Sequence, residues 1–342
     1  MIGKAAVETH GLAIGYSRKG QPPKVVNEGM DLYLNKGELT CLLGLNGAGK
    51  STLLRTICGF QPSLAGYVEI MGRDLTSYKP LELALILGVV LTEKTNAGGI
   101  TVYELVSLGR HPYTGFFSRL KAEDKRIIEE SMSAVGILNK AGSYVSELSD
   151  GERQKAMIAK TLAQQCPVIV LDEPTAFLDI TSRIEMMILL RRLAVEQGKA
   201  ILLSTHDLEQ AIQLADKLWL MRSKPQNILC GCPEDLILNG EFQDFFARDN
   251  ITFDISTGKM DINMKREPVF LQGESNTVFW VRNALERNGY SPVEDESVSR
   301  LAVYCFSPDN IVLRNKDGKE VVAGSVGELI RNLIVDKVSE TS

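Results

Sequence analysis

One nine-residue segment constrains the fold of this chain more than any other feature. It reads Gly-Leu-Asn-Gly-Ala-Gly-Lys-Ser-Thr at positions 44–52, directly after the apolar run Leu39–Leu43 and before a helical pattern. The spacing Gly-x4-Gly-Lys-Ser is that of a P-loop, in which glycines let backbone N–H groups turn towards a polyphosphate and a helix N-terminus adds its positive dipole end. The segment therefore predicts a strand–loop–helix unit that binds a nucleotide.

Two side chains of this loop are candidates for binding the phosphates and their Mg²⁺. We expect Lys50 to reach the β- and γ-phosphates as a point charge, and the Ser51 hydroxyl to take a place on Mg²⁺. A glycine-rich turn before a helix is the simpler interpretation, but it leaves the Lys-Ser pair after a buried strand unexplained. The loop residues expected to bind the nucleotide are Asn46, Gly47, Ala48, Gly49, Lys50, Ser51 and Thr52.

A second apolar run ends in two acidic residues. Val168–Leu171 is followed by Asp172 and Glu173, and ligands of open α/β sheets bind at the carboxyl ends of strands. Asp172 fits the surroundings of Mg²⁺, and Glu173 is placed to polarise the water that attacks the γ-phosphate. Capping of the following helix is the structural alternative, and the P-loop upstream favours the catalytic role.

Short apolar runs and helical patterns alternate over about the first 240 residues. Besides the two runs above, Ala200–Leu203 and Lys217–Met221 are continuous, as is typical of strands buried on both faces of a mostly parallel sheet. This order predicts an α/β domain over residues 1–250. The whole chain has 342 residues, which is enough for about two domains.

Composition excludes several classes of protein. With 38 Lys and Arg against 43 Asp and Glu, the net charge is −5, which is unfavourable for binding nucleic-acid phosphates. No apolar run approaches the roughly 20 residues that span a bilayer, and the N-terminus has no apolar signal-peptide core, so we expect a cytosolic protein. The six cysteines are expected to be free thiols, with Cys230 and Cys232 in a surface turn rather than a metal site.

The pattern changes after about residue 250 to short strands separated by turns. We predict a separate α+β domain over residues 251–342, which serves either as a dimer-stabilising appendage or as a regulatory domain that senses a signal. The strand candidates are Thr252–Ile255, Pro268–Leu271, Leu301–Phe306, Ile311–Leu313 and Val321–Val322.

Two helices are expected in this second domain. One covers about Thr277–Asn288, where we predict Trp280, Val281 and Leu285 to be core residues rather than ligand contacts. The other begins at Ser325, whose Ser-x-x-Glu pattern is a capping box.

The segment Glu147–Gln154 carries the first specific resemblance to a known family. It reads Glu-Leu-Ser-Asp-Gly-Glu-Arg-Gln, about twenty residues before Asp172, and closely resembles the LSGGQ signature of ABC ATPases. By that resemblance, Ser149 and Gly151 present a hydroxyl and helix N-terminal amides to a phosphate. A helix cap alone would explain Ser149, but it would not explain the order and spacing of the other motifs.

Three further positions follow the order of motifs in an ABC ATPase. Asp179 resembles the D-loop aspartate, His206 the switch histidine that hydrogen-bonds a γ-phosphate, and Tyr16 the aromatic that stacks on adenine. The resemblance covers about residues 5–240. It implies a P-loop ABC ATPase cassette with a helical subdomain at about 92–165, and ATP and Mg²⁺ as the bound groups.

The resemblance also implies partners. ABC ATPases pair head to tail, with each ATP between the P-loop of one subunit and the signature of the other, and one of each motif here implies a homodimer. Closing on ATP and opening after hydrolysis drives separate polytopic membrane permease subunits. The expected location is therefore peripheral, on the cytoplasmic face of the cell membrane, with a substrate-binding protein as an indirect partner and no nucleic acid.

The segment Ile100–Tyr113 resembles one branch of this family. Its Thr-Val-Tyr-Glu-Leu-Val and Gly-Arg-His-Pro runs look like those of importers for ferric siderophores, haem and cobalamin, and imply import of a metal chelate. Two alternatives remain open, a soluble ABC ATPase that acts on nucleic acid or ribosomes, and an exporter ATPase. The acidic charge and the single cassette disfavour the first, and the segment itself disfavours the second.

Glu93 departs from the family pattern. It falls where ABC ATPases carry a glutamine, and the sequence has no glutamine between Gln61 and Gln154. A carboxylate also ligates Mg²⁺, and it adds negative charge near Glu173, so we expect turnover that is slower or more sensitive to Mg²⁺. Glu93→Gln should therefore change the Mg²⁺ dependence of the ATPase rate. An unchanged Mg²⁺ titration would favour the alternative, a solvated loop glutamate outside the site.

Overall fold

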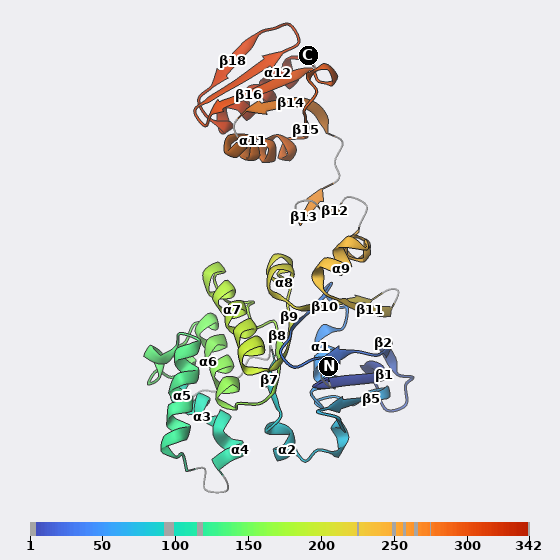
Figure 1. The fold of residues 1–342 in the computed structure, drawn as a ribbon, viewed down its shortest axis with the longest axis vertical. Helices are drawn as coiled ribbons and strands as arrows, with labels where there is room; N and C mark the ends of the chain where they lie inside the picture. The colour runs from blue at the N-terminus through green and yellow to red at the C-terminus, as the bar shows by residue number, and fades with distance from the viewer. Residues whose placement is uncertain are drawn as a thin grey trace. The chain divides into compact units, whose positions relative to one another are not determined.

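The protein is described here by a computed structural model in which the chain forms two compact units (Figure 1). One unit comprises residues 1–247 and 253–259, and the other residues 248–252 and 260–342. The structure describes residues 5–91, 99–114, 119–223, 226–247, 251–255, 258–262, 266–273 and 275–340.

A six-stranded sheet forms the centre of the first unit, in the order β11-β10-β4-β9-β8-β7. Neighbouring strands from β10 to β7 are parallel, and β11 is antiparallel to β10. This confirms the predicted α/β class and brings the carboxyl ends of β4, β8 and β9 to one edge. The strands are β4 (Leu39–Gly44), β7 (Leu87–Val90), β8 (Val168–Asp172), β9 (Ala200–Ser204), β10 (Lys217–Ser223) and β11 (Gln226–Gly231).

A second sheet of five strands is antiparallel and has the order β2-β1-β5-β6, with β3 also paired to β1. Its apolar side chains share one core with α1 and one face of the central sheet. The strands are β1 (Val7–Tyr16), β2 (Lys24–Met30), β3 (Tyr33–Leu34), β5 (Ala65–Ile70) and β6 (Arg73–Asp74).

The central strands are buried on both faces because successive side chains alternate between two cores. Leu42 packs in the core shared with α1, whereas Cys41 and Leu43 pack in a second core with the helices on the other face. The runs in the sequence are continuously apolar because both faces of these strands are buried. No described helix is both long and apolar enough to cross a membrane.

Helices cover the central sheet and form a separate helical region (Figure 1). The helical region consists of α3 (Val102–Ser107), α4 (His111–Thr114), α5 (Ala122–Ala134) and α6 (Asp150–Ala163), with the 3-10 turns η2 (Leu108–Arg110), η3 (Leu138–Lys140) and η4 (Val145–Glu147). The remaining elements of this unit are α1 (Lys50–Ile57), η1 (Leu75–Ser77), α2 (Pro80–Ala84), α7 (Ile180–Gln197), α8 (Leu208–Leu214), α9 (Pro233–Leu238) and α10 (Glu241–Phe246).

Arg110 is the central polar residue of the helical region. Its side chain is buried and donates from Nε to Asp124 Oδ1 on α5 at 2.9 Å. The same guanidinium donates to the carbonyl of Ala163 at the end of α6 and to Gln165 Oε1, each at 2.9 Å, and it stacks over the Tyr113 ring at 4.0 Å. One side chain thus joins η2, α4, α5 and α6.

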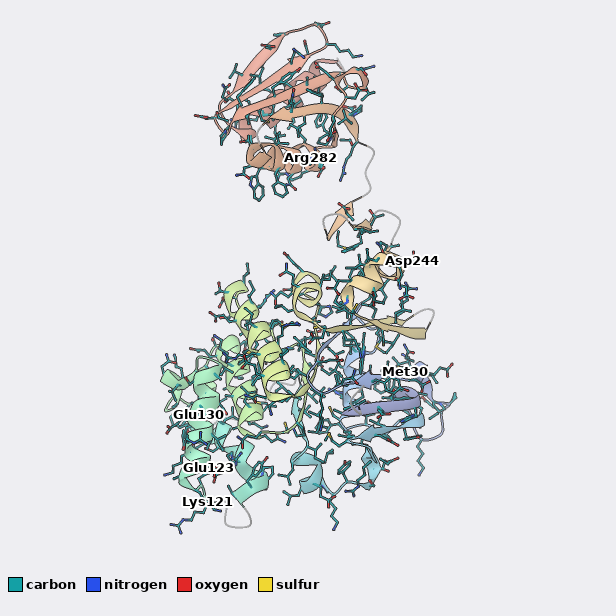
Figure 2. The ribbon with its side chains drawn as sticks, viewed as in Figure 1. Met30, Lys121, Glu123, Glu130, Asp244 and Arg282 are labelled. Atoms are coloured by element: carbon teal, nitrogen blue, oxygen red, sulfur yellow. The ribbon has the colours of Figure 1, made fainter. Side chains whose placement is uncertain are left out.

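The preceding Gly109 permits this close packing. A Cβ atom at Gly109 would lie 2.2 Å from the backbone carbonyl oxygen of Lys160 on α6. The outward side of α5 is solvated by contrast, and exposed Glu123 and Glu130 mark it in Figure 2. The Gly-Arg run of the segment that resembles the importers therefore serves the packing of η2 on α6.

The second unit contains a five-stranded mixed sheet in the order β15-β14-β16-β17-β18. Helices α11 (Ser275–Arg287) and α12 (Val326–Glu340) pack on one face of it. The strands are β14 (Glu267–Gly273), β15 (Tyr290–Val293), β16 (Leu301–Ser307), β17 (Asn310–Asn315) and β18 (Glu320–Ala323), with the turn η5 (Glu296–Val298). A separate two-stranded sheet consists of β12 (Ile251–Asp254) and β13 (Lys259–Ile262), and its residues are divided between the two units.

The sequence did not predict β13 or β15. Strand β15 contains Pro292, which cannot donate a ladder hydrogen bond and so argues against a strand. It is tolerated because β15 lies at the edge of the sheet, where β14 is its one partner among the described strands.

The prediction that Trp280 is a core residue is wrong. Val281 and Leu285 are fully buried, as predicted, but Trp280 is 67% exposed. Residues 281 and 285 share one face of α11, and residue 280 is rotated by about 100° from 281 around the helix axis. The Trp280 ring meets that of Phe279 edge to face, with the centroids 5.2 Å apart.

The cysteines agree with one prediction and contradict another. All six are free thiols. Cys230 and Cys232 do not form a surface turn, however, because Cys230 lies in β11 and Cys232 is the residue that precedes α9. The antiparallel pairing of β10 with β11, which includes Trp219 opposite Cys230, extends the sheet through this segment.

Candidate functional site

The loop between β4 and α1 has the backbone of a phosphate-binding loop. Helix α1 begins at Lys50, and the preceding Gly49 has a φ of 104°. That conformation disfavours any side chain, and a Cβ atom at Gly49 would also lie 2.3 Å from Cγ1 of Val26. The chain therefore needs glycine here to present the first N–H groups of α1 to a ligand.

Lys50 lies within this loop. Its ammonium donates to the carbonyl of Gly44 at 2.7 Å and to that of Leu45 at 3.5 Å, and the residue is 7% exposed. Burial lowers the pKa of Lys50 from its usual value, and the negative charges of Glu173 and Asp172 oppose that shift. The site thus combines one buried cation with the carboxylates of Asp172, the last residue of β8, and of Glu173, which follows it.

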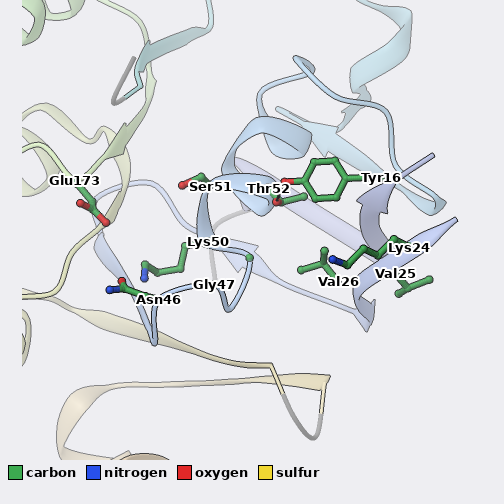
Figure 3. Close-up of a pocket in the computed structure, with 11 residues that line it drawn as sticks. Tyr16, Lys24, Val25, Val26, Asn46, Gly47, Lys50, Ser51, Thr52 and Glu173 are labelled. Atoms are coloured by element: carbon green, nitrogen blue, oxygen red, sulfur yellow. Dashed lines mark hydrogen bonds between the residues drawn. The ribbon is translucent and has the colours of Figure 1, made fainter. Parts of the chain in front are cut away.

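A cleft of about 470 Å³ runs from the loop towards β1 and β2 (Figure 3). At one end Tyr16 is 49% exposed, and its hydroxyl shares a hydrogen bond with Thr52 Oγ1 at 2.8 Å. Glu173 lies across the loop from Tyr16 in Figure 3. The lining residues are Tyr16, Lys24, Val25, Val26, Asn46, Gly47, Gly49, Lys50, Ser51, Thr52 and Glu173.

Three residues that line the cleft were not predicted from the sequence: Lys24, Val25 and Val26. They belong to β2, and the pairing of Lys24 with Tyr16 in the antiparallel sheet brings them to the cleft. No motif marks them, because their place depends on the strand register. Ala48 is predicted to bind nucleotide, but its side chain is buried in the core with α1, so its backbone N–H is the group that it can offer.

Asp172 is the last residue of β8 and Glu173 follows it. Both lie at the edge of the sheet that carries the loop between β4 and α1. Asp172 is 5% exposed, and its Oδ1 accepts a hydrogen bond of 2.6 Å from the hydroxyl of Ser204 at the end of β9. The same hydroxyl accepts a hydrogen bond of 2.9 Å from the backbone N–H of Glu173. Glu173 has a φ of 49°, a left-handed conformation that costs a residue with a side chain about 1–2 kcal/mol.

His206 contacts the predicted base directly. Its Nε2 lies 2.7 Å from Glu173 Oε1 in a hydrogen bond, with the two side chains 46% and 31% exposed. His206 also lines a smaller cavity of about 200 Å³ beside Gly44 and Asn46. The structure therefore brings together Lys50, Glu173 and His206, the three candidate catalytic residues.

The predicted signature residues lie elsewhere in the unit, at the start of α6. Ser149 caps this helix: its Oγ accepts from the N–H of Glu152 at 3.2 Å, and its own N–H donates to Glu152 Oε2 at 2.9 Å. Gly151 is in the first turn of α6. Helix capping is therefore a role that Ser149 has within its own chain.

Asp179 has a similar position at the start of α7. Its carboxylate accepts from the N–H and the hydroxyl of Ser182, each at 2.9 Å, and these hydrogen bonds hold the pKa of Asp179 below its usual value. The three residues Ser149, Gly151 and Asp179 are thus at helix N-termini and do not line the described cleft.

Two of the three predicted Mg²⁺ ligands, Ser51 and Asp172, are among the described residues. Ser51 lines the cleft and Asp172 is a buried residue at the end of β8, and hard oxygen donors of this kind suit Mg²⁺. The third, Glu93, lies outside the described residues, with the rest of segment 92–98.

A parallel sheet with a phosphate loop, an acidic strand end and a capped signature helix defines an ATP-binding cassette. The family described as "ABC transporter" matches residues 27–176, and the one described as "Iron ABC transporter C-terminal domain" matches residues 265–334. The chain belongs to the ABC transporter ATP-binding proteins, and it is an ABC ATPase.

Individual relatives support this assignment. The chain is 39% identical over 290 residues to an uncharacterized ABC transporter ATP-binding protein of Methanocaldococcus jannaschii, covering 84% of this chain and 98% of the relative. It is 36% identical to the ferric enterobactin transport ATP-binding protein FepC of Escherichia coli, covering 66% and 81%. A solved ABC transporter described as metal-chelate type, in an inward-facing conformation, aligns with a TM-score of 0.58 at 27% identity, covering 68% of this chain and 85% of that one.

Proposed function

We propose that this chain is the ATP-hydrolysing subunit of an ABC importer for a metal chelate, with a ferric siderophore as the first candidate and haem or cobalamin next. The observation that supports the ATPase chemistry is that Lys50 and Glu173 line the same cleft as Tyr16, and that His206 hydrogen-bonds to Glu173. The direction and cargo rest on similarity, because the relatives include a ferric enterobactin transport ATP-binding protein and an Iron(3+)-hydroxamate import ATP-binding protein.

The cleft suggests how ATP would lie. Adenine stacks on the exposed ring of Tyr16, and the phosphates extend along the loop to Lys50. Ser51 and Asp172 would hold Mg²⁺, which would supply positive charge to offset that of the phosphates. Glu173 orients the attacking water and accepts its proton, and His206 holds the Glu173 carboxylate in place and reaches the γ-phosphate.

A homodimer would complete the site. Ser149, Gly151 and Asp179 lie at helix N-termini outside the chain's own cleft, where they can face the phosphates of a second copy arranged head to tail. Closure on ATP then supplies charge stabilisation that one chain lacks. Permease subunits at the cytoplasmic face of the membrane would respond to that closure, and a substrate-binding protein would take part indirectly.

Reconstitution tests this proposal. We expect the chain to co-purify with a polytopic membrane protein, and vesicles with the complex to take up a labelled ferric siderophore with ATP, at a rate lost in the Glu173→Gln complex. Haem and cobalamin serve as competing cargoes in the same assay. Export from the vesicles, or co-purification with RNA or DNA and no membrane partner, would contradict the proposed function.

A further inference from the structure

Ser204 connects Asp172, the last residue of β8, with the next residue, Glu173, through a single buried hydroxyl. The residue is fully buried at the carboxyl end of β9, directly opposite Asp172 in the parallel register. Its Oγ donates to Asp172 Oδ1 at 2.6 Å and accepts from the backbone N–H of Glu173 at 2.9 Å. A serine hydroxyl has one proton, so donation to Asp172 fixes its orientation.

These two hydrogen bonds control different parts of the site. The bond to Oδ1 fixes the rotation of the Asp172 carboxylate. The bond from the N–H of Glu173 holds a backbone with a φ of 49°, a conformation that persists only where the surroundings maintain it. Two residues further along the same strand end, His206 holds the Glu173 carboxylate at 2.7 Å. The end of β9 therefore holds both the backbone and the side chain of the base.

We infer that Ser204 is a positioning residue for ATP hydrolysis: its hydroxyl couples the orientation of the Asp172 carboxylate to the backbone of Glu173. The inference rests on the proposed roles of those two residues. Ser204 itself contacts neither nucleotide nor water in this assignment. It acts through Asp172 and Glu173, and the hydroxyl, not the volume of the side chain, is the group required.

Removing the hydroxyl tests the inference. We expect Ser204→Ala to lower kcat about tenfold or more, since a small misplacement of a base has such effects, and to raise the Mg²⁺ concentration for half-maximal rate. Affinity for ATP without Mg²⁺ should change less than about twofold, because the P-loop is intact. Ser204→Thr keeps a hydroxyl on a strand and should recover most of kcat. Equal kcat and Mg²⁺ midpoints in Ser204→Ala and the wild type would overturn the inference.

Two further measurements separate positioning from packing. Thr161→Val removes another buried hydroxyl, on α6, which donates to the Met157 carbonyl, and it should leave kcat and the Mg²⁺ midpoint unchanged. A second measurement covers the case in which threonine does not fit at position 204. It compares Glu173→Gln with Glu173→Gln/Ser204→Ala and asks how much Mg²⁺ raises the ATP affinity of each. Binding requires no base, so this comparison does not depend on hydrolysis. An equal gain in both would overturn the inference. Wild-type turnover by Glu173→Gln would instead contradict the proposed function.

Discussion

Glu173→Gln is expected to bind ATP as tightly as the wild type and to hydrolyse it roughly 100-fold more slowly or worse, which is the usual contribution of a positioned general base. The amide has the shape of the carboxylate and leaves the backbone bond to Ser204 unchanged. It cannot accept a proton from water, and it carries no charge to hold His206. Steady-state ATPase rates and nucleotide binding on the same samples measure the two effects separately.

The same variant should also shift the oligomeric state. If hydrolysis is what releases a head-to-tail dimer, Glu173→Gln accumulates as a dimer with ATP and Mg²⁺ and returns to monomer when ATP is removed, as seen by gel filtration. Glu196→Gln, an exposed glutamate on α7, makes the same chemical change away from the cleft and should behave as the wild type. Turnover near the wild-type rate in Glu173→Gln would show that another group is the base.

The parts of the site that the sequence predicted are those held by local chain geometry. The P-loop is a contiguous strand–loop–helix segment, and its glycine spacing determines its shape before any tertiary contact forms. Likewise, Asp172 comes directly after one apolar run and His206 comes shortly after another. The parallel topology then determines the edge of the sheet on which both residues lie. For these residues position along the chain was sufficient.

The parts that the sequence did not predict depend on register and rotation. Lys24 reaches the cleft because β2 pairs with β1 in one register. Ser204 meets Asp172 because β8 and β9 start their parallel ladder at Val168 and Ala200. The signal that could have identified Ser204 is a polar residue at the end of an apolar strand, next to a strand that ends in an acidic residue. In α11, a rotation of one residue separates exposed Trp280 from buried Val281.

Arg110→Met should destabilise the protein by about 3–5 kcal/mol, the usual cost of leaving the partner of a buried ion pair uncompensated. Arg110 and Asp124 have side chains 6% and 9% exposed, with Nε and Oδ1 2.9 Å apart. Methionine fills much of the volume but donates no hydrogen bond, so the Ala163 carbonyl and the Asp124 carboxylate both lose a donor. Urea unfolding of the two proteins measures the difference in the free energy of unfolding.

The effect should depend on pH with a definite sign. Hydrogen bonds from the backbone N–H of Lys121 and then from Arg110, together with the charge of Arg110, hold the pKa of Asp124 below its usual value. A carboxylate with a lowered folded-state pKa contributes stability above its unfolded-state pKa and loses it as the pH falls through the folded-state value. The gap in stability between wild type and Arg110→Met should therefore be full at neutral pH and narrow in acid.

A matched pair on the same helix provides the control. Arg126 and Glu130 on α5 are only 2.7 Å apart, but their side chains are 61% and 60% exposed, and such i,i+4 pairs contribute about 0.3–0.5 kcal/mol. Arg126→Met should therefore be nearly neutral, and equal small losses in both variants would show that burial does not strengthen the Arg110 pair. If Arg110→Met loses much more stability than Arg126→Met, the arginine of the importer-like Gly-Arg-x-Pro run stabilises the packing of η2 on α5 and α6. The resemblance in that run would then reflect the packing of the helical region.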